Sequence, residues 1–417
     1  MSLAAKGAID LTIHSSPAAA TDAEFVAGLL RRQPEGFSLH QGLYNSPEAF
    51  RHDLERIFGR HWFLAGHAGS APAPGDYYLA DIGTESIIIV RGQDGVLRAF
   101  ANVCRHRGSH VCTKPEGHAS VLVCPYHAWA YNLDGTLRSA RYMGPDFDKS
   151  LYGLKPVHIE VAEGLVFISL ADKPLNFEPA RKAIKAAHGP YGWADAKVAH
   201  RQTYEIEANW KLAVENYLEC YHCTPSHPEY SKLHALEKPP EQIEVMNAAM
   251  EARTCAMGVN VAATDHCVAS ASGDAAIFCF RYALYDGVKS GGPSGEALAP
   301  LMGEFPDYDG GVTSTHQWPA SFFVAYNDNG VLYRFIPRTA STCAMEIVWL
   351  VQGDAKAGVD YNLDKLTWLW QVTSEADKRI TQDNQKGVNS RYYQPGPYAP
   401  MEANLKAWAK WYLGEIG

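Results

Sequence analysis

The sequence predicts an α+β protein of two domains: a β-rich N-terminal domain at 45–170 and a second domain at 171–417 in which helices flank an antiparallel sheet. Three observations support this prediction. The chain has 417 residues, more than one domain of roughly 100–200 residues usually holds. Short alternating or apolar runs separated by turn residues fill the first part. Further strand patterns fill the second part, and two helical patterns end it.

The chain opens with two helical patterns. Apolar residues recur at spacings of three and four over 22–34 and 47–60, which is typical of amphipathic helices. We expect the segment 20–44 to pack against the second domain.

Strand patterns dominate the first domain. Gly92-Gln93-Asp94-Gly95 and Asp134-Gly135 each separate two of these runs, and both are hairpin signals. The expected strands are Tyr77–Ile82, Ser86–Arg91, Val96–Val103, Ala128–Leu133, Thr136–Ser139 and Leu165–Leu170.

The second domain begins with a helical pattern over 209–223. Pro225 and Pro228 should end this helix, because proline lacks the backbone N–H and disfavours helix at the residue before it. The expected strands are 245–254, 276–284, 320–327, 331–337 and 343–352, and the expected final helices are 361–386 and 401–413.

Composition excludes several classes of protein. The net charge of −9 and the pI near 6.0 do not fit a basic nucleic-acid-binding surface. No run of about 18 apolar residues occurs, so a membrane-spanning helix is not expected. The first twenty residues lack an apolar signal core, and nine cysteines are an odd number without a signal, so a cytoplasmic protein without a disulfide framework is expected.

Two Cys-His pairs form the first candidate metal site. Cys104-x-His106 is followed, after seventeen residues, by Cys124-x-x-His127. Two cysteines and two histidines are a common zinc set. However, one residue between Cys and His is not the usual zinc-finger spacing. The spacing matches the Rieske pattern, in which two cysteines hold one iron and two histidines hold the other.

The segment CRHRGSH…CPYH resembles the Rieske domain of the non-heme iron oxygenases. The resemblance implies that Cys104 and Cys124 bind one iron of a [2Fe-2S] cluster and that His106 and His127 bind the other. Neutral imidazoles in place of thiolates raise the reduction potential of such a cluster.

A second group of candidate ligands lies in ECYHCTPSH. Glu219 and His222 are three residues apart and would share a helix face, and His227 follows the proline break. Two imidazoles need an anionic third ligand to form a facial triad with open iron positions. The late helix offers three carboxylates that the residue pattern alone does not separate: Glu375, Asp377 and Asp383.

Resemblance to the oxygenases of quaternary amines ranks these carboxylates. In that family the ligand Asp lies eight residues before the Gln of a Gln-Arg-Gly segment. The similar segment here is Gln385-Lys386-Gly387, which makes Asp377 the first choice and Asp383 the second. The resemblance also implies that Glu219 joins His222 to His127 of the neighbouring subunit, as an acidic residue three before the first His does in the family.

The same resemblance implies a function. It is O₂-dependent N-demethylation of a quaternary ammonium compound, with proline betaine first and glycine betaine second, by an oxygenase holding a [2Fe-2S] Rieske cluster and a mononuclear Fe(II). No G-x-G-x-x-G opens a helix, so the electrons should come from a separate NAD(P)H-dependent reductase. Homotrimers are common in the family. Two alternatives remain: an aromatic-ring-hydroxylating dioxygenase and a Rieske electron carrier with an inert second domain.

A quaternary ammonium substrate would need aromatic faces, and its carboxylate would need a polar or cationic partner. The aromatic candidates on or beside the expected strands are Trp318, Phe322, Phe323, Tyr326, Tyr333 and Trp349. Strand alternation means that only about half of them can face one pocket. The candidate partners of the carboxylate are Arg253, His266, Arg281 and Arg334.

Overall fold

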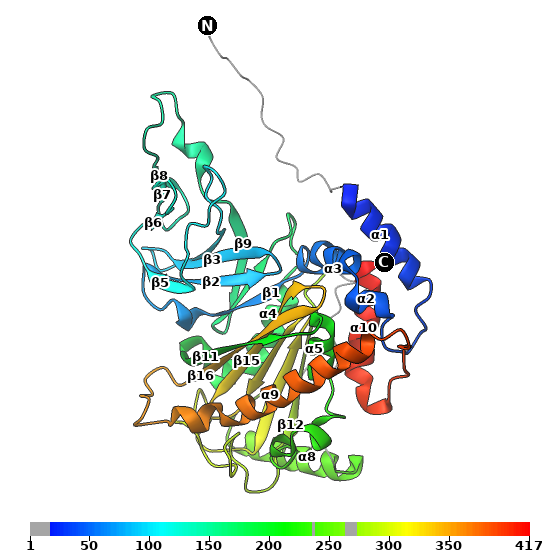
Figure 1. The fold of residues 1–417 in the computed structure, drawn as a ribbon. Helices are drawn as coiled ribbons and strands as arrows, with labels where there is room; N and C mark the ends of the chain where they lie inside the picture. The colour runs from blue at the N-terminus through cyan, green and yellow to red at the C-terminus, as the bar shows by residue number, and fades with distance from the viewer. Residues whose placement is uncertain (1–16, 236–237, 263–272) are drawn as a thin grey trace.

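Three antiparallel sheets organise the computed structural model, which describes residues 17–235, 238–262 and 273–417. A seven-stranded sheet and a three-stranded sheet lie at one end of the molecule, and a six-stranded sheet lies at the other (Figure 1). The predicted α+β class is confirmed.

The seven-stranded sheet has the order β1-β10-β9-β4-β3-β2-β5. Its strands are β1 Phe63–His67, β2 Asp76–Ile82, β3 Glu85–Arg91, β4 Leu97–Ala101, β5 Glu116–His118, β9 Pro156–Ala162 and β10 Leu165–Ser169. Alternating apolar side chains of β3 face two cores, because Ile87 and Ile89 belong to one cluster and Ile88 and Val90 to another.

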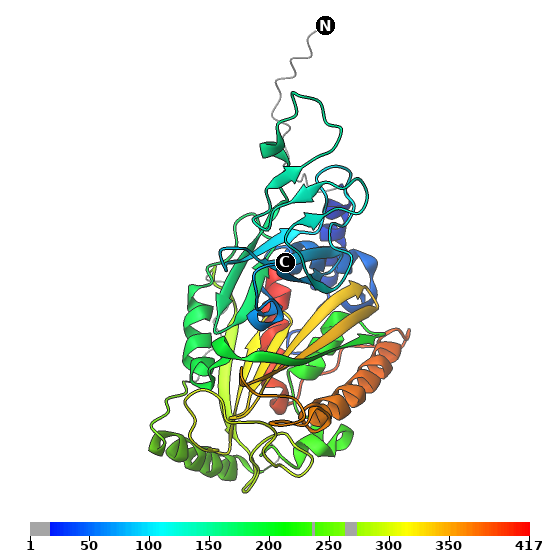
Figure 2. The ribbon, with the colours of Figure 1, turned by 90° about the vertical axis from the view of Figure 1, so that its left-hand side faces the viewer.

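The small sheet comprises β6 Leu122–Val123, β7 Ala130–Tyr131 and β8 Leu137–Ser139. It stands away from the large sheet in both views (Figures 1 and 2). The loop that joins β6 to β7 contains Cys124 and His127. One of the two predicted Cys-His pairs therefore lies at this outer end of the molecule.

The six-stranded sheet has the order β11-β16-β15-β14-β13-β12. Its strands are β11 Lys197–Ile206, β12 Ile277–Ala283, β13 Gly311–Gln317, β14 Ser321–Ala325, β15 Gly330–Thr339 and β16 Thr342–Val351. Helices α5 Trp210–Tyr217 and α9 Leu363–Val388 pack on one face, while α4 Glu178–His188 contributes to a separate core on the other.

The N-terminal segment packs against the helices of the second half of the chain. Tyr44 donates a hydrogen bond to Glu215 in α5, and a ring nitrogen of His52 lies 2.9 Å from the backbone oxygen of Ile416. The helices there are α1 Pro17–Leu30, α2 Gln41–Asn45, α3 Pro47–Asp53, the π-helical turn η1 Leu54–Phe58 and α10 Ala403–Ile416.

Several predicted elements are wrong. The segment 245–254 was expected to be a strand but lies in helix α8, Pro240–Ala256, because its Ala, Met and Glu residues favour helix. Strand β13 was missed because its residues Thr313 to Gln317 are mostly polar, although hydrogen bonds pair it on both sides. Helix α5 ends at Tyr217, well before the predicted 223; two one-turn helices, α6 Cys223–Ser226 and α7 Pro228–Ser231, follow it.

Within the described ranges, none of the helices combines the length and the apolar character that crossing a membrane requires.

Candidate active site

The four predicted Rieske ligands lie on two adjacent loops. The thiols of Cys104 and Cys124 are buried, while the side chains of His106 and His127 are exposed. The two imidazole rings lie 4.6 Å apart between centroids in an edge-to-face arrangement. The two thiols are therefore buried beneath the loops, and the two imidazoles lie beside each other at the surface.

The two loops repeat one turn. The N–H of Gly108 donates to the oxygen of Cys104 at 2.9 Å, and the N–H of Ala128 donates to the oxygen of Cys124 at 3.1 Å. Both donors have positive φ, +78° for Gly108 and +57° for Ala128. A left-handed alanine costs about 1 kcal/mol, so the surrounding structure holds the second loop in a conformation that its sequence does not favour.

Aromatic side chains support this group. The hydroxyl of Tyr131 lies 3.3 Å from the Cys104 sulfur, and Trp129 stacks on His106 with a centroid distance of 4.9 Å. Burial raises the pKa of the Cys104 thiol, which favours the protonated form unless a metal replaces the proton. Two buried thiols and two adjacent imidazoles fit the mixed ligation of a Rieske cluster.

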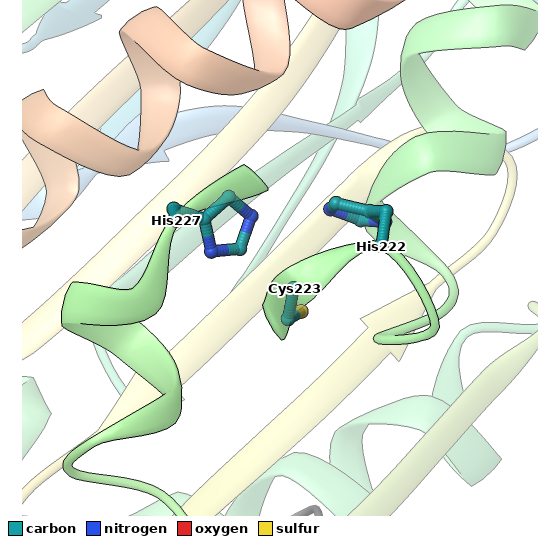
Figure 3. Close-up of side chains that lie close together, drawn as sticks. All are labelled: His222, Cys223 and His227. Carbon is teal, nitrogen blue, oxygen red and sulfur yellow. The ribbon is translucent and has the colours of Figure 1, made fainter. Parts of the chain in front are cut away.

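His222, His227 and Asp377 form a second group. One oxygen of Asp377 lies 3.2 Å from Nε2 of His222 and 3.1 Å from Nε2 of His227. His222 precedes α6 and His227 follows it, while Asp377 comes from α9. The two imidazoles face each other across the short helix in Figure 3. This donor set of two neutral nitrogens and one carboxylate fits the facial triad of a non-heme Fe(II) site.

Carboxylates set the electrostatics here. Burial opposes a charge on His222, but hydrogen bonds with Asp377 and Glu219 outweigh it and raise its pKa to about 10. Burial likewise opposes ionisation of Asp377, but the two imidazoles lower its pKa overall. The group therefore favours positive charge between the carboxylates, which is the electrostatic condition for holding a cation.

Glu219 contacts His222 by a different route from the one predicted. Because α5 ends at Tyr217, the two residues do not share a helix face. One oxygen of Glu219 accepts a hydrogen bond from Nδ1 of His222 at 2.6 Å. The other oxygen accepts the backbone N–H groups of Tyr221 and His222, so the carboxylate closes the turn that carries the histidine.

The two other carboxylates of α9 lie elsewhere. Asp383 is exposed and forms an ion pair with Lys386 at 2.8 Å, and Glu375 is exposed as well. The structure thus brings the first-choice carboxylate to the histidines and leaves the alternatives outside. Sequence reasoning did not single out Cys223, whose sulfur lies within 4.8 Å of a ring nitrogen of each histidine (Figure 3).

A cavity of about 280 Å³ adjoins this group. His222, His227 and Asp377 line it together with a set of aromatic side chains. The aromatic members are Tyr217, Tyr230, Phe280, Tyr282, Tyr333 and Trp370. None of the described lining residues is Lys or Arg. The cavity therefore offers several aromatic faces, which suit a permanent cation.

Most of the pocket residues expected from the sequence lie outside this cavity. Of the six aromatic candidates only Tyr333 lines it. Arg281 pairs with Asp309 at 2.7 Å and Arg334 with Glu346 at 2.8 Å. Phe280, Tyr282 and Tyr333, which are next to these arginines in sequence, line the cavity. Because side chains alternate along a strand, both arginines point to the opposite face of the sheet.

The other two candidate partners of a substrate carboxylate do not reach the cavity in this structure either. Arg253 is exposed and donates to the backbone oxygen of Asp309, and it does not line the cavity. His266 lies outside the described residues.

The comparison with known families agrees with both ligand groups. Residues 61–158 match the Rieske [2Fe-2S] domain, and residues 193–416 match the catalytic domain of the ring-hydroxylating α subunits. The chain belongs to this family of Rieske non-heme iron oxygenases. It is therefore an oxygenase α subunit whose cofactors are a [2Fe-2S] cluster and a mononuclear iron, with O₂ as cosubstrate. The electron-carrier alternative does not account for the catalytic domain.

Relatives of this α subunit act on quaternary amines. It is 36% identical over 399 residues to the glycine betaine monooxygenase oxygenase subunit of Pseudomonas aeruginosa (strain UCBPP-PA14), covering 93% of this chain and 90% of that one. It is 40% identical over 205 residues to the carnitine monooxygenase oxygenase subunit of Escherichia coli (strain K12), covering 47% and 54%. A solved quaternary ammonium Rieske monooxygenase shares the fold, with a TM-score of 0.71, 24% identity and coverage of 97% and 100%.

Proposed function

We propose that this α subunit removes an N-methyl group from a betaine as formaldehyde, with proline betaine as the first candidate substrate and glycine betaine as the second. The electrons come from a separate NAD(P)H-dependent reductase. The protein acts in the cytoplasm as a homotrimer, with its Rieske domain at 45–170 and its catalytic domain at 171–417.

The site residues have separate roles in this proposal. Cys104, His106, Cys124 and His127 hold the cluster. His222, His227 and Asp377 hold the mononuclear iron. The cluster supplies electrons when bound, and the iron supplies dioxygen activation. Glu219 is a positioning residue, because its contact with Nδ1 fixes which nitrogen of His222 faces the metal.

The aromatic cavity beside the triad is the observation that supports a quaternary ammonium substrate. Ring faces attract a trimethylammonium-type cation, and aromatic enclosure removes it from water without requiring deprotonation. The side chains of Tyr217 and Tyr333 lie 4.8 Å apart between centroids, and both line the cavity with Asp377. A hydrocarbon would also fit aromatic walls, but it would gain nothing from the attraction of the ring faces for a cation.

The proposed reaction inserts one oxygen atom into a C–H bond of an N-methyl group. The substrate, O₂, two electrons and two protons give an N-hydroxymethyl product and water. This carbinolamine then loses formaldehyde and a proton, which leaves the tertiary amine. The cavity walls exclude bulk water and orient the N-methyl group toward the triad.

The position of the small sheet supports electron transfer between subunits. The β6–β7 loop carries His127 on the part of the molecule that stands away from the six-stranded sheet and α9 (Figures 1 and 2). His127 is exposed, so a neighbouring copy can approach it. We therefore assign Glu219 the further role of joining His222 to His127 of the partner subunit in a closed ring.

Turnover with candidate substrates tests the proposal. With a suitable reductase and NADH, the protein should consume O₂ and release one formaldehyde per proline betaine. Formation of a cis-diol from naphthalene or benzoate, without betaine-dependent O₂ uptake, would replace this proposal with ring dihydroxylation.

Glycine betaine is the second candidate because a relative that covers most of the chain is a glycine betaine monooxygenase. Competition between the two betaines separates them. If kcat/KM is higher for glycine betaine than for proline betaine, glycine betaine takes first place.

A further inference from the structure

Two polar side chains on β13 line the cavity without a polar partner. Ser314 and His316 alternate with Thr313 and Thr315 along the strand, so both face the cavity. Each side chain is about 5% exposed. Within the part of the chain that the structure describes, no hydrogen bond is formed by either side chain, which is uncommon for polar groups at this burial.

Aromatic rings enclose the His316 imidazole. Phe280 and Phe322 lie edge-to-face with it at centroid distances of 5.1 Å, and Phe278 lies at 6.2 Å. Burial lowers the pKa of His316 to about 3, so at neutral pH the ring is uncharged and offers one N–H donor. A buried donor without a partner costs free energy, which a ligand can recover.

Several other polar groups of the cavity wall are engaged. Tyr230 and Tyr282 share a hydrogen bond at 2.8 Å, and Thr373 donates to the backbone oxygen of Leu369. The hydroxyl of Tyr333 pairs with Ser374, while Asn216 lies 3.3 Å from Nε2 of His222. Asn404 is exposed. Within the described residues, the hydroxyl of Tyr217 and the indole N–H of Trp370 also line the cavity without a hydrogen bond, but Ser314 and His316 are the two such donors that lie on one strand.

We infer that His316, with Ser314 beside it, binds the carboxylate of the betaine substrate. This inference rests on the proposed function and adds the group that distinguishes a betaine from a simple ammonium ion. A betaine has no net charge, so the cavity needs no cationic residue. Its cation is attracted by the aromatic ring faces, and its carboxylate accepts hydrogen bonds from Ser314 and His316.

A matched pair of ligands tests this role. N,N-dimethylpyrrolidinium is proline betaine without its carboxylate. Calorimetry on the anaerobic holoenzyme should show that His316→Phe weakens proline betaine binding about tenfold or more. The same variant should change dimethylpyrrolidinium binding by less than about twofold, because that ligand has no group for the imidazole to bind.

Two further variants complete the test. His316→Asn keeps an N–H donor and should retain more betaine affinity than His316→Phe; it also decides the question if the Phe variant does not fold. His200→Phe is the control, because His200 packs on Trp349 and does not line the cavity, and it should alter neither affinity.

Equal losses for both ligands in His316→Phe, or no loss for either, would overturn the inference and leave the proposed function intact. Equal binding of the two ligands by the unmodified protein would do the same. If the unmodified protein binds neither ligand, the proposed function fails together with the inference.

Discussion

The two candidate iron centres differ in how the chain builds them and in how much of them reaches the surface. The Rieske group comes from two loops separated by seventeen residues, and both of its imidazoles are exposed. The catalytic group joins a turn after α5 to helix α9, and Asp377 comes 150 positions after His227 in the chain. The side chain of His227 is only 5% exposed.

This difference matches two kinds of chemistry. An exposed cluster can meet a reductase and a neighbouring subunit, which electron transfer requires. An enclosed centre would keep bulk water away from the iron and hold the substrate in one orientation. The four predictions that follow test this contrast, from the largest expected effect to the smallest.

Removing a ligand of the exposed centre should have the largest effect. In Cys124→Ser, two of about three irons per chain and all turnover should be lost, because the cluster needs its full ligand set. Iron analysis and the red-brown absorbance of the purified protein measure this loss. Unmodified protein that stays colourless and binds only zinc after anaerobic reconstitution with iron and sulfide would contradict the Rieske assignment.

Removing the carboxylate of the enclosed centre should abolish turnover but spare the cluster. In Asp377→Ala, iron should fall from about three to about two per chain, because two imidazoles without an anion bind Fe(II) weakly. Asp383→Ala is the matched control on the same helix and should behave like the unmodified protein. The reverse result would show that Asp383 is the ligand.

Breaking the link between the centres should leave both metals in place. Glu219→Gln keeps the size of the side chain but removes its charge, so product formation should fall at least 10–100-fold, roughly the effect of losing a residue that orients a metal ligand. Single-turnover oxidation of the reduced cluster would locate the defect. Retention of more than about half the normal rate would exclude this role for Glu219.

Enclosure should also make stability near the catalytic centre depend on pH. Burial raises the pKa of Glu215 from 4.5 to about 8, although the hydrogen bond from Tyr44 opposes the shift. The folded protein therefore holds this proton more tightly than the unfolded chain, and stability should fall as pH rises from about 5 through 8. In Glu215→Gln this loss should disappear; urea unfolding between about pH 5 and pH 8 measures it, and it should amount to a few kcal/mol at most, roughly.

The Rieske region contains an exposed ion pair, Asp76–His118, whose effect on stability can be compared with that of the buried Glu215. A hydrogen bond with His118 lowers the pKa of Asp76 below the usual value of an aspartate. The pair therefore stabilises the fold at pH values above that usual pKa, and the stabilisation is lost as the pH falls through the lowered pKa. The side chain of His118 is mostly exposed, and such pairs contribute about 1 kcal/mol or less. Asp76→Asn should therefore change the pH dependence of the free energy of unfolding less than Glu215→Gln does. An equally large change would show that burial of the carboxyl does not determine the size of the pH response.

Sequence reasoning performed best where structure is local. The hairpins around Gly92–Gly95 and Asp134–Gly135 occur as predicted, and the four Rieske candidates share a site because each pair lies within one short loop. It failed where tertiary contacts decide. The polar residues of β13 do not follow a strand pattern, and the strand forms because β12 and β14 pair with it on both sides. His316 was therefore not predicted to line the cavity.

By itself, the sequence determined the α+β class, the two ligand groups and the family, because these depend on short-range pattern and ligand spacing. Only the tertiary structure decided which carboxylate meets the histidines and which face of the sheet lines the cavity. Asp383 lies six residues after Asp377 in α9, roughly one and two-thirds turns, so the two carboxylates are on different sides of the helix. Phe280 and Arg281 are consecutive in β12, so their side chains are on opposite faces of the sheet.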